Sequence, residues 1–211
     1  IGGGTTDIAV WKDGSLIHSQ IIPVGGNHFT NDLAVALKIP HNEAERIKLN
    51  HGCVLPEKVN QAAHISVQGL SGTKPREVRL GTVAEVLGAR AEELFSIIDT
   101  SIKDANLEGL ITGGYVITGG GALIKGLQEL SEYVLEKPAK IGFPKPFGGM
   151  TNIMQNPKFS TVLGLMLETS ENFENKRTDK NKNKMTKSQG PDHDILGRFS
   201  DSLKNVFREI F

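Results

Sequence analysis

Apolar and polar residues alternate along residues 5–24, and this pattern predicts a β-hairpin. The stretches TDIAVW and LIHSQIIPV each alternate, and the sequence Lys12-Asp13-Gly14-Ser15 separates them. Alternation is typical of half-buried strands, and an Asp-Gly pair between two such runs is a strong hairpin signal. We therefore expect two antiparallel strands joined by a tight turn at Asp13 and Gly14.

Two stretches with helical spacing follow the hairpin, at residues 27–37 and 40–52. In the first, apolar residues recur every three or four positions, and the second is rich in charged residues. Asn27 or Thr30 is the expected N-cap of the first helix, and Gly52 is expected to end the second. Taken alone, the second is an ordinary ion-paired surface helix, because Glu and Lys pairs at such spacings are common.

The chain then mixes short strands with helices as far as residue 170. The longest helical pattern covers residues 82–103 and places its apolar residues on one face, namely Val83, Val86, Leu87, Leu94, Ile97, Ile98 and Ile102. The other expected elements are short strands in HISVQGL, EVRL and AKIGF, a buried strand over 115–118, and helices in ALIKGLQELSEYVLE and KFSTVLGLMLE. This mixture indicates an α/β fold.

Two glycine-rich turns interrupt the pattern. The first is Gly2, Gly3, Gly4, Thr5 and Thr6, and the second is Gly119, Gly120, Gly121 and Ala122, between a strand and a helix. Glycine lets the backbone approach a ligand closely, successive N–H groups suit phosphate oxygens, and threonine adds hydroxyl donors. The first turn leads into a hairpin, whereas a P-loop needs Gly-Lys-Ser/Thr opening a helix. A tight hairpin turn is the plainer interpretation of that motif.

Composition narrows the possible functions. The 211 residues include 24 basic and 24 acidic side chains and 38% hydrophobic residues, a globular composition with no net attraction to nucleic acid. Cys53 is the single cysteine, so the sequence predicts no intramolecular disulfide. His51 lies two residues from it without a second pair of ligands, so the sequence predicts no metal site either. No signal peptide or apolar run of transmembrane length is present. Because the sequence starts inside a motif and not with Met, we expect a piece of a longer protein.

The composition changes after residue 170. Residues 171–194 are rich in Asn, Lys, Asp and Ser, which predicts a disordered basic linker, and within it residues 175–188 carry six basic side chains and one acidic one. Residues 195–211 predict an amphipathic helix about 26 Å long at ~1.5 Å per residue. Such a helix suits a membrane interface better than a bilayer-spanning position, or docks on a protein surface. Its apolar stripe is Ile195, Leu196, Phe199, Leu203, Val206, Phe207, Ile210 and Phe211.

These motifs together resemble those of the actin, Hsp70 and sugar-kinase superfamily. IGGGTTDIAV looks like its second phosphate motif, lacking only the Asp that usually precedes the Ile, and YVITGGGALIKGL looks like its adenosine motif. EAERIKLNHG resembles the helix whose Glu and Lys hold ribose and adenine. GGNHFTNDLA followed by AERIKLNHG, together with the amphipathic C-terminus, resembles the second half of the FtsA family of bacterial cell-division proteins.

The resemblance implies an actin-like (ribonuclease-H-like) α/β fold with two subdomains. Residues 1–25 and 104–170 would form the larger subdomain, 2A, and residues 26–103 an inserted smaller α/β subdomain, 2B. A disordered linker over 171–194 and a membrane-targeting helix over 195–211 would follow.

The resemblance also implies ATP with Mg²⁺ as the ligand. Gly2, Gly3, Gly4, Thr5 and Thr6 would bind phosphate, whereas the Mg²⁺ ligand is expected from the half of the protein that this chain lacks. Glu45 and Lys48 would hold ribose and adenine with Gly52 near the base, and the second turn, Gly119, Gly120, Gly121 and Ala122, would face the α-phosphate and nucleoside. No catalytic residue is identifiable in this half, so the resemblance implies at most weak ATPase activity.

The implied function is to tether FtsZ filaments to the cytoplasmic face of the cell membrane at the division site. The implied partners are the FtsZ C-terminal peptide, further copies of the protein in actin-like filaments, an anionic membrane surface and other division proteins. Arg90 and Phe159 are the expected peptide contacts, although a surface arginine and a core phenylalanine explain them equally well. A turning-over ATPase or kinase of the same superfamily and a pilus-assembly relative remain as alternative functions.

Overall fold

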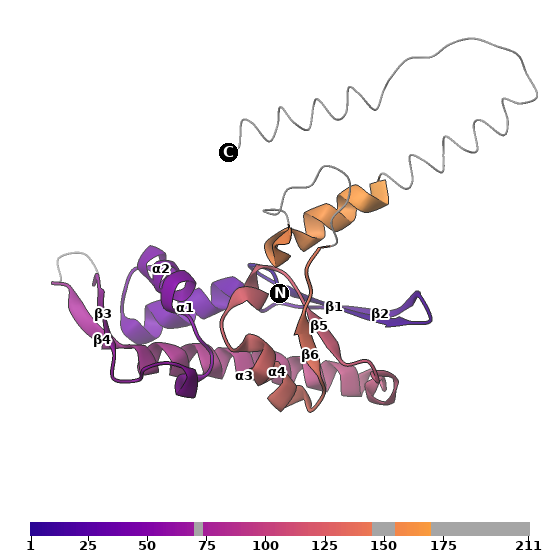
Figure 1. Cartoon of the computed structure of the whole chain (residues 1–211), viewed down its shortest axis with the longest axis horizontal. Coiled ribbons are helices and arrows are strands. Elements are labelled where there is room, and N and C mark those ends of the chain that lie inside the picture. Colours follow the sequence, from indigo (N-terminus) through magenta and orange to yellow (C-terminus); the bar gives the residue numbers. More distant parts are fainter. Residues whose placement is uncertain (70–73, 145–154, 170–211) are drawn as a thin grey trace, which may run out of the picture. The chain divides into compact units, whose positions relative to one another are not determined.

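The computed structural model describes residues 1–69, 74–144 and 155–169. Residues 1–165 form one compact unit, and its helices and strands are labelled in Figure 1. The expected linker and amphipathic helix, residues 171–194 and 195–211, lie outside the described residues. No helix in the described part of the chain is both long enough and apolar enough to cross a bilayer.

The predicted hairpin is confirmed. Strand β1 (Thr6–Lys12) pairs antiparallel with β2 (Ser15–Ile22), with a shift in register between Val10 and Trp11. Asp13 and Gly14 both have positive φ, 50° and 78°, as the tightest hairpin turns require.

The two predicted helices after the hairpin are confirmed as α1 (Gly26–Leu37) and α2 (His41–His51), and the prediction that Gly52 ends α2 is correct. The predicted N-cap of α1 is wrong, because the cap is Gly25 and not Asn27 or Thr30. The helix begins early because the N–H groups of its first two residues find acceptors elsewhere in the chain.

Helix α3 (Leu80–Asp104) is the longest described element and follows β4 (Arg76–Arg79) directly. That strand pairs antiparallel with β3 (His64–Val67), and both lie in stretches that the sequence predicted as short strands. Figure 1 shows α3 running along the unit, with α1 and α4 packed against it. Its predicted apolar face is largely buried, although Ile97 is 36% exposed.

The strand before the second glycine turn and the helix after it both differ from the predicted ones. Strand β5 (Tyr115–Ile117) is parallel to β6 (Ala139–Ile141), but it is not fully buried, since Val116 is 61% exposed. The glycines enter a 3₁₀ turn (Gly120–Leu123), and α4 (Leu127–Leu135) begins only after Gly126. With its φ of 80°, Gly126 lies in the left-handed region and separates the two helical segments.

The described chain ends in a further helical segment. A 3₁₀ turn (Pro157–Phe159) leads into a helix over residues 160–169, in agreement with the helix predicted for KFSTVLGLMLE. Leu163 is its most buried described residue and Phe159 is half-buried.

A groove of 560 Å³ lies between β1 and residues 110–118, and α3 contributes Phe95, Ile98 and Ile102 to its wall. Successive residues of β1 and of the stretch 110–118, which includes β5, line the groove, so these two strands border it with their edges and not with one face of a sheet. Residues 2–5 and 119–122 do not line this groove, and Thr6 is the one residue of the two glycine turns that does.

Candidate functional site

The first glycine turn is an exposed loop of backbone donors. Residues 2–5 are exposed, and the N–H of Gly2 donates to the carbonyl of Thr5 at 2.9 Å, which closes the turn. Within the described residues, the N–H groups of Gly3, Gly4 and Thr5 have no hydrogen-bond acceptor. Successive free N–H groups in a turn form a concavity that binds anions.

The start of α1 holds this turn in place. The N–H groups of Gly26 and Asn27 donate to the carbonyls of Gly2 and Gly3 at 2.8 and 2.7 Å. A Cβ atom at Gly25 would lie 2.8 Å from Gly2 O, Gly3 O and Thr5 N, so a larger residue there would displace the turn. The sequence analysis gave Gly25 and Gly26 no role, although a glycine pair between a strand and a helix was a visible signal.

Thr6 does not share the exposed position of Thr5. Its side chain is buried, with the residue 4% exposed, and its hydroxyl donates to the carbonyl of Val24 at 2.8 Å. This bond joins the first residue of β1 to the segment that leads into α1. Of the two threonines expected to bind phosphate, only Thr5 presents its side chain at the surface.

The second glycine turn adjoins the first through Ile1. The backbone amino group of Ile1 donates to the carbonyl of Thr118 at 2.7 Å, and Gly121 donates to the carbonyl of Ile1 at 3.1 Å. A Cβ atom at Gly119 or Gly121 would overlap Ile1, whereas a Cβ atom at Gly120 would have its nearest neighbour, in Lys158, at 3.8 Å. Packing thus requires glycine at two positions of this turn and leaves Gly120 open.

The Glu and Lys of α2 lie beside the start of α1. The ammonium of Lys48 donates to Gly26 O at 2.9 Å, to Thr30 Oγ1 at 2.8 Å and to Glu45 Oε2 at 2.7 Å. The Glu45 side chain is 38% exposed and that of Lys48 is 9% exposed. Partial burial works to raise the pKa of Glu45, but hydrogen bonds from Lys48 and Thr30 outweigh it, so this pKa lies below its ordinary value.

The C-terminal end of α2 meets the segment that follows the second glycine turn. Gly52 donates to Lys48 O at 3.0 Å, and a Cβ atom at Gly52 would overlap that oxygen. The N–H of Val54 donates to Lys125 O at 2.9 Å. The structure therefore gathers the three residue sets that the sequence analysis singled out around the start of the chain.

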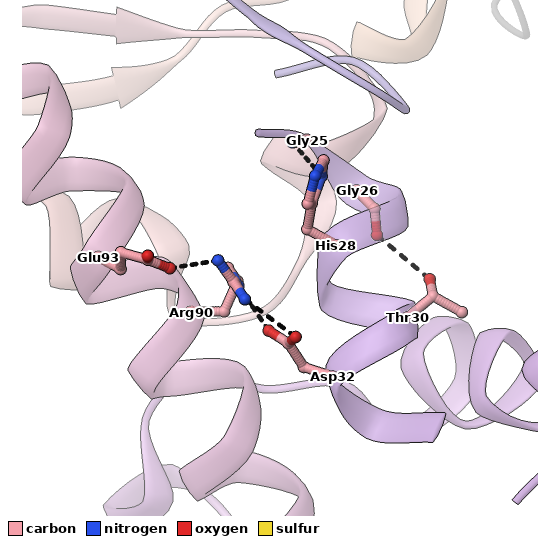
Figure 2. A network of polar contacts seen from close by, with 7 residues as sticks. All are labelled: Gly25, Gly26, His28, Thr30, Asp32, Arg90 and Glu93. Atoms are coloured by element: carbon pink, nitrogen blue, oxygen red, sulfur yellow. Dashed lines mark hydrogen bonds and ion pairs between the residues drawn. The ribbon is translucent and has the colours of Figure 1, made fainter. Parts of the chain in front are cut away.

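Figure 2 shows that α1 is also bonded to α3. Arg90 Nη2 donates to Asp32 Oδ1 at 2.9 Å, its Nε also donates to Asp32, and its Nη1 donates to Glu93. The hydrogen bond with Asp32 raises the pKa of Arg90. At the start of α1, Nδ1 of His28 accepts the N–H of Gly25 at 3.1 Å, and Thr30 Oγ1 lies 3.2 Å from Gly26 O (Figure 2). Arg90 and Phe159, the two residues expected to contact a partner, both have contacts within the chain. The Lys158 ammonium lies 4.7 Å from the centre of the Phe159 ring.

A family model described as "Cell division protein FtsA" matches residues 1–164. The chain belongs to the FtsA family. It is 37% identical over 167 residues to the FtsA of Pseudomonas aeruginosa, covering 79% of this chain and 40% of that protein. For the FtsA of Escherichia coli K12 the identity is 36% over 173 residues, 79% of this chain and 41% of the relative. The chain thus spans about two fifths of the length of these relatives.

Solved structures show the fold. The chain is similar to MreB5 of Spiroplasma citri bound to ADP, with a TM-score of 0.65 and 24% identity, covering 83% of this chain and 54% of that one. A MamK mutant bound to AMPPNP matches with a TM-score of 0.56 and 20% identity, covering 78% and 50%. The fold expected from the FtsA resemblance, α/β and actin-like, is therefore confirmed, and the family match favours FtsA over a pilus-assembly relative.

Proposed function

We propose that this chain forms one wall of the ATP site of an actin-like division protein. The observation that carries the proposal is the row of three exposed residues, Gly3, Gly4 and Thr5, whose N–H groups have no acceptor in the described structure. A phosphate oxygen accepts several hydrogen bonds at once, so such a row suits the phosphates of a nucleotide.

The neighbouring groups suit the rest of the nucleotide. Glu45 keeps an exposed carboxylate edge that can accept hydrogen bonds from ribose hydroxyls. The open face at Gly120 leaves room for the α-phosphate. Gly52 is buried, and the space beside its Cα is filled by Lys48 O, so of these two glycines only Gly120 offers such room. In the described residues, no group of three or more His, Cys, Asp or Glu side chains is placed to hold a metal. From the FtsA resemblance alone, we propose that the Mg²⁺ ligand comes from residues outside this chain.

The similar structures support this choice of ligand. The MreB5 structures of Spiroplasma citri contain ADP or AMPPNP, and the MamK mutant contains AMPPNP. All three share the fold of this chain. An adenine nucleotide is therefore the ligand to test first.

We propose further that the whole protein tethers FtsZ filaments to the cytoplasmic side of the cell membrane at the division site. The amphipathic sequence of residues 195–211 and the basic residues 175–188 support membrane attachment. The FtsA family and the actin-like fold support self-association and contacts with other division proteins.

Docking of the FtsZ C-terminal peptide on subdomain 2B, residues 26–103, belongs to the same proposal. A guanidinium has five N–H donors, and Arg90 directs one from each nitrogen to Asp32 or Glu93. The remaining donors can bind a carboxylate of an acidic peptide, and half-buried Phe159 would add an apolar contact.

An NMR titration of the chain with ATP tests the nucleotide site directly. We expect the amide signals of Gly3, Gly4 and Thr5 to shift and saturate, because their N–H groups would change from water to phosphate acceptors. Adenosine, which has no phosphate, should leave these three signals nearly unchanged. Unshifted signals at millimolar ATP would contradict the proposal.

A further inference from the structure

Lys48 is buried between α1 and α2, with a side chain that is 9% exposed. An ammonium has three N–H donors and no acceptor. Those of Lys48 are matched by three acceptors of the chain, which are Gly26 O, Thr30 Oγ1 and Glu45 Oε2, at 2.7 to 2.9 Å. Lys48 therefore has no donor left over for a ligand.

The first of these acceptors connects Lys48 to the glycine turn. The carbonyl of Gly26 accepts from Lys48, and the N–H of the same residue donates to Gly2 O at 2.8 Å. The next residue, Asn27, donates to Gly3 O at 2.7 Å. A Cβ atom at Gly26 would lie 3.7 Å from Lys48 Nζ and 3.4 Å from Gly2 O, so both groups pack against this one residue.

The other two acceptors keep the ammonium in place. Thr30 lies one helical turn after Gly26 on α1, and its hydroxyl also donates to Glu45. Glu45 balances the charge of Lys48, without which burial of an ammonium would be costly. The cluster thus ties α2 to the first residues of α1, and those residues hold the first glycine turn through the bonds to Gly2 O and Gly3 O.

We infer that Lys48 is a positioning residue for the Gly2–Thr5 turn and not a ligand of the nucleoside. It fixes Gly26, and Gly26 and Asn27 in turn fix the carbonyls of Gly2 and Gly3. The free N–H groups of the turn are then aimed at a polyphosphate. The inference rests on the proposed nucleotide site for its ligand, but its structural part can be tested without any ligand.

Amide hydrogen exchange of the ligand-free chain tests the structural part. Lys48→Met removes the bond to Gly26 and keeps a long side chain, so exchange at Gly26 and Asn27 should become about tenfold faster. Arg46→Met is the matched control, because it removes the same charge from α2 at a side chain that is 46% exposed and paired with Glu43. Unchanged α3 amides would show that the variant is folded, and unchanged exchange at Gly26 and Asn27 would overturn the inference.

Binding of ATP and of inorganic tripolyphosphate tests the functional part. A positioning role predicts that Lys48→Met weakens both ligands by the same factor, about tenfold. Thr30→Val, which removes one acceptor without changing shape, should weaken both ligands in the same proportion. Weaker binding of ATP with unchanged binding of tripolyphosphate would show nucleoside contact and overturn the inference. If the unmodified chain binds neither ligand, the proposed nucleotide site fails, and the exchange measurement alone decides the role of Lys48.

Discussion

The carbonyl oxygen of Ile1 accepts the N–H of Gly121 at 3.1 Å. Together with the bond from Ile1 N to Thr118 O, it brings two glycine turns that lie far apart in the sequence side by side. The side chain of Ile1 also fills the space beside Gly121, so the second turn packs directly against the residue that precedes the first turn. The two turns are therefore one structural unit, and a substitution in one turn can alter the conformation of the other.

Gly120→Asp should severely weaken ATP binding and leave the fold intact. A Cβ atom there would have its nearest neighbour at 3.8 Å, so the side chain fits, but its carboxylate would repel phosphate. We expect the affinity to fall roughly tenfold or more, since about 1.4 kcal/mol of repulsion is enough for that factor. Calorimetric titration measures the affinity, and thermal unfolding checks the fold.

The comparison variant for this test is Gly121→Ala, whose Cβ atom would overlap Ile1. It should lower the unfolding temperature, whereas Gly120→Asp should not. Unchanged ATP affinity in the Gly120 variant would remove the second turn from the nucleotide site.

Gly25→Ala should destabilise the chain by about 1–3 kcal/mol, the usual cost of forcing extra atoms into a packed site. Its Cβ atom would lie 2.8 Å from three backbone atoms of the first turn, and none of them is the end of a flexible side chain. Urea unfolding measures the change.

Gly164→Ala is the opposite case, because it adds a Cβ atom to a helix at a position with no other atom within 4 Å. It should stabilise the chain by about 0.5–1 kcal/mol, which the same urea unfolding measures.

Local sequence patterns predicted the elements whose cause is local. The alternation and the Asp13-Gly14 pair were sufficient for the hairpin, and apolar spacing was sufficient for most of α3. The start of α1 was missed because its first N–H groups bond to carbonyls of Gly2 and Gly3, which no local pattern reveals.

In the candidate site, too, local motifs could be recognised in the sequence, whereas features that depend on tertiary contacts could not. The motifs singled out three residue sets that lie far apart in the sequence, and the structure brings them together. The direction of each side chain depends on tertiary contacts, so the sequence could not show that Lys48 bonds to Gly26 or that Thr6 bonds to Val24. The delayed start of α4 likewise follows from the left-handed backbone of Gly126, which packs against Leu55.

Arg90→Ala should cost about 1–2 kcal/mol of folding stability, between the values for exposed and buried ion pairs. Arg90 and Asp32 have side chains that are 22% and 25% exposed, and they join α3 to α1. A double-mutant cycle with Asp32→Ala measures the coupling in urea. A coupling near zero would show that the pair does not hold the helices together.

The same pair tests the proposed docking of the FtsZ peptide. Arg90→Ala should weaken peptide binding, more so at low salt, because exposed charge attraction is screened by ions. Asp32→Asn should strengthen it, since it releases donors of Arg90 for a peptide carboxylate. Peptide affinity that responds to neither substitution, nor to Phe159→Ala, would place the docking surface elsewhere.

Glu45 should make the stability of the chain depend on acid pH. Its pKa is lowered from the ordinary value of 4.5 in the folded state, so its contribution is complete above that pH. The contribution is lost as the pH falls through the lower folded-state value. The stability difference between the unmodified chain and Glu45→Gln should therefore be constant above pH 4.5 and shrink below it. A difference that stays constant in acid would contradict the assigned pairing with Lys48.

Residues 171–211, fused to a soluble carrier, should bind anionic vesicles. The stripe from Ile195 to Phe211 contains eight large apolar residues, and burying each contributes up to roughly 1.5–3 kcal/mol, less at an interface. Residues 195–211 carry three basic and two acidic side chains, so most of the charge attraction must come from residues 175–188, with six basic and one acidic. Near an anionic surface each basic residue contributes about 1 kcal/mol.

Co-sedimentation with vesicles measures this binding. Because two weak signals together give stable anchoring, high salt should release part of the protein by screening the basic residues. Replacing both Phe199 and Phe207 by Glu should abolish binding, because each change puts a charge on the apolar stripe. Asn205→Glu adds a charge to the polar face and should bind much more strongly than the double variant. If the unmodified segment stays in the supernatant with anionic vesicles, this protein does not attach to membranes through residues 171–211.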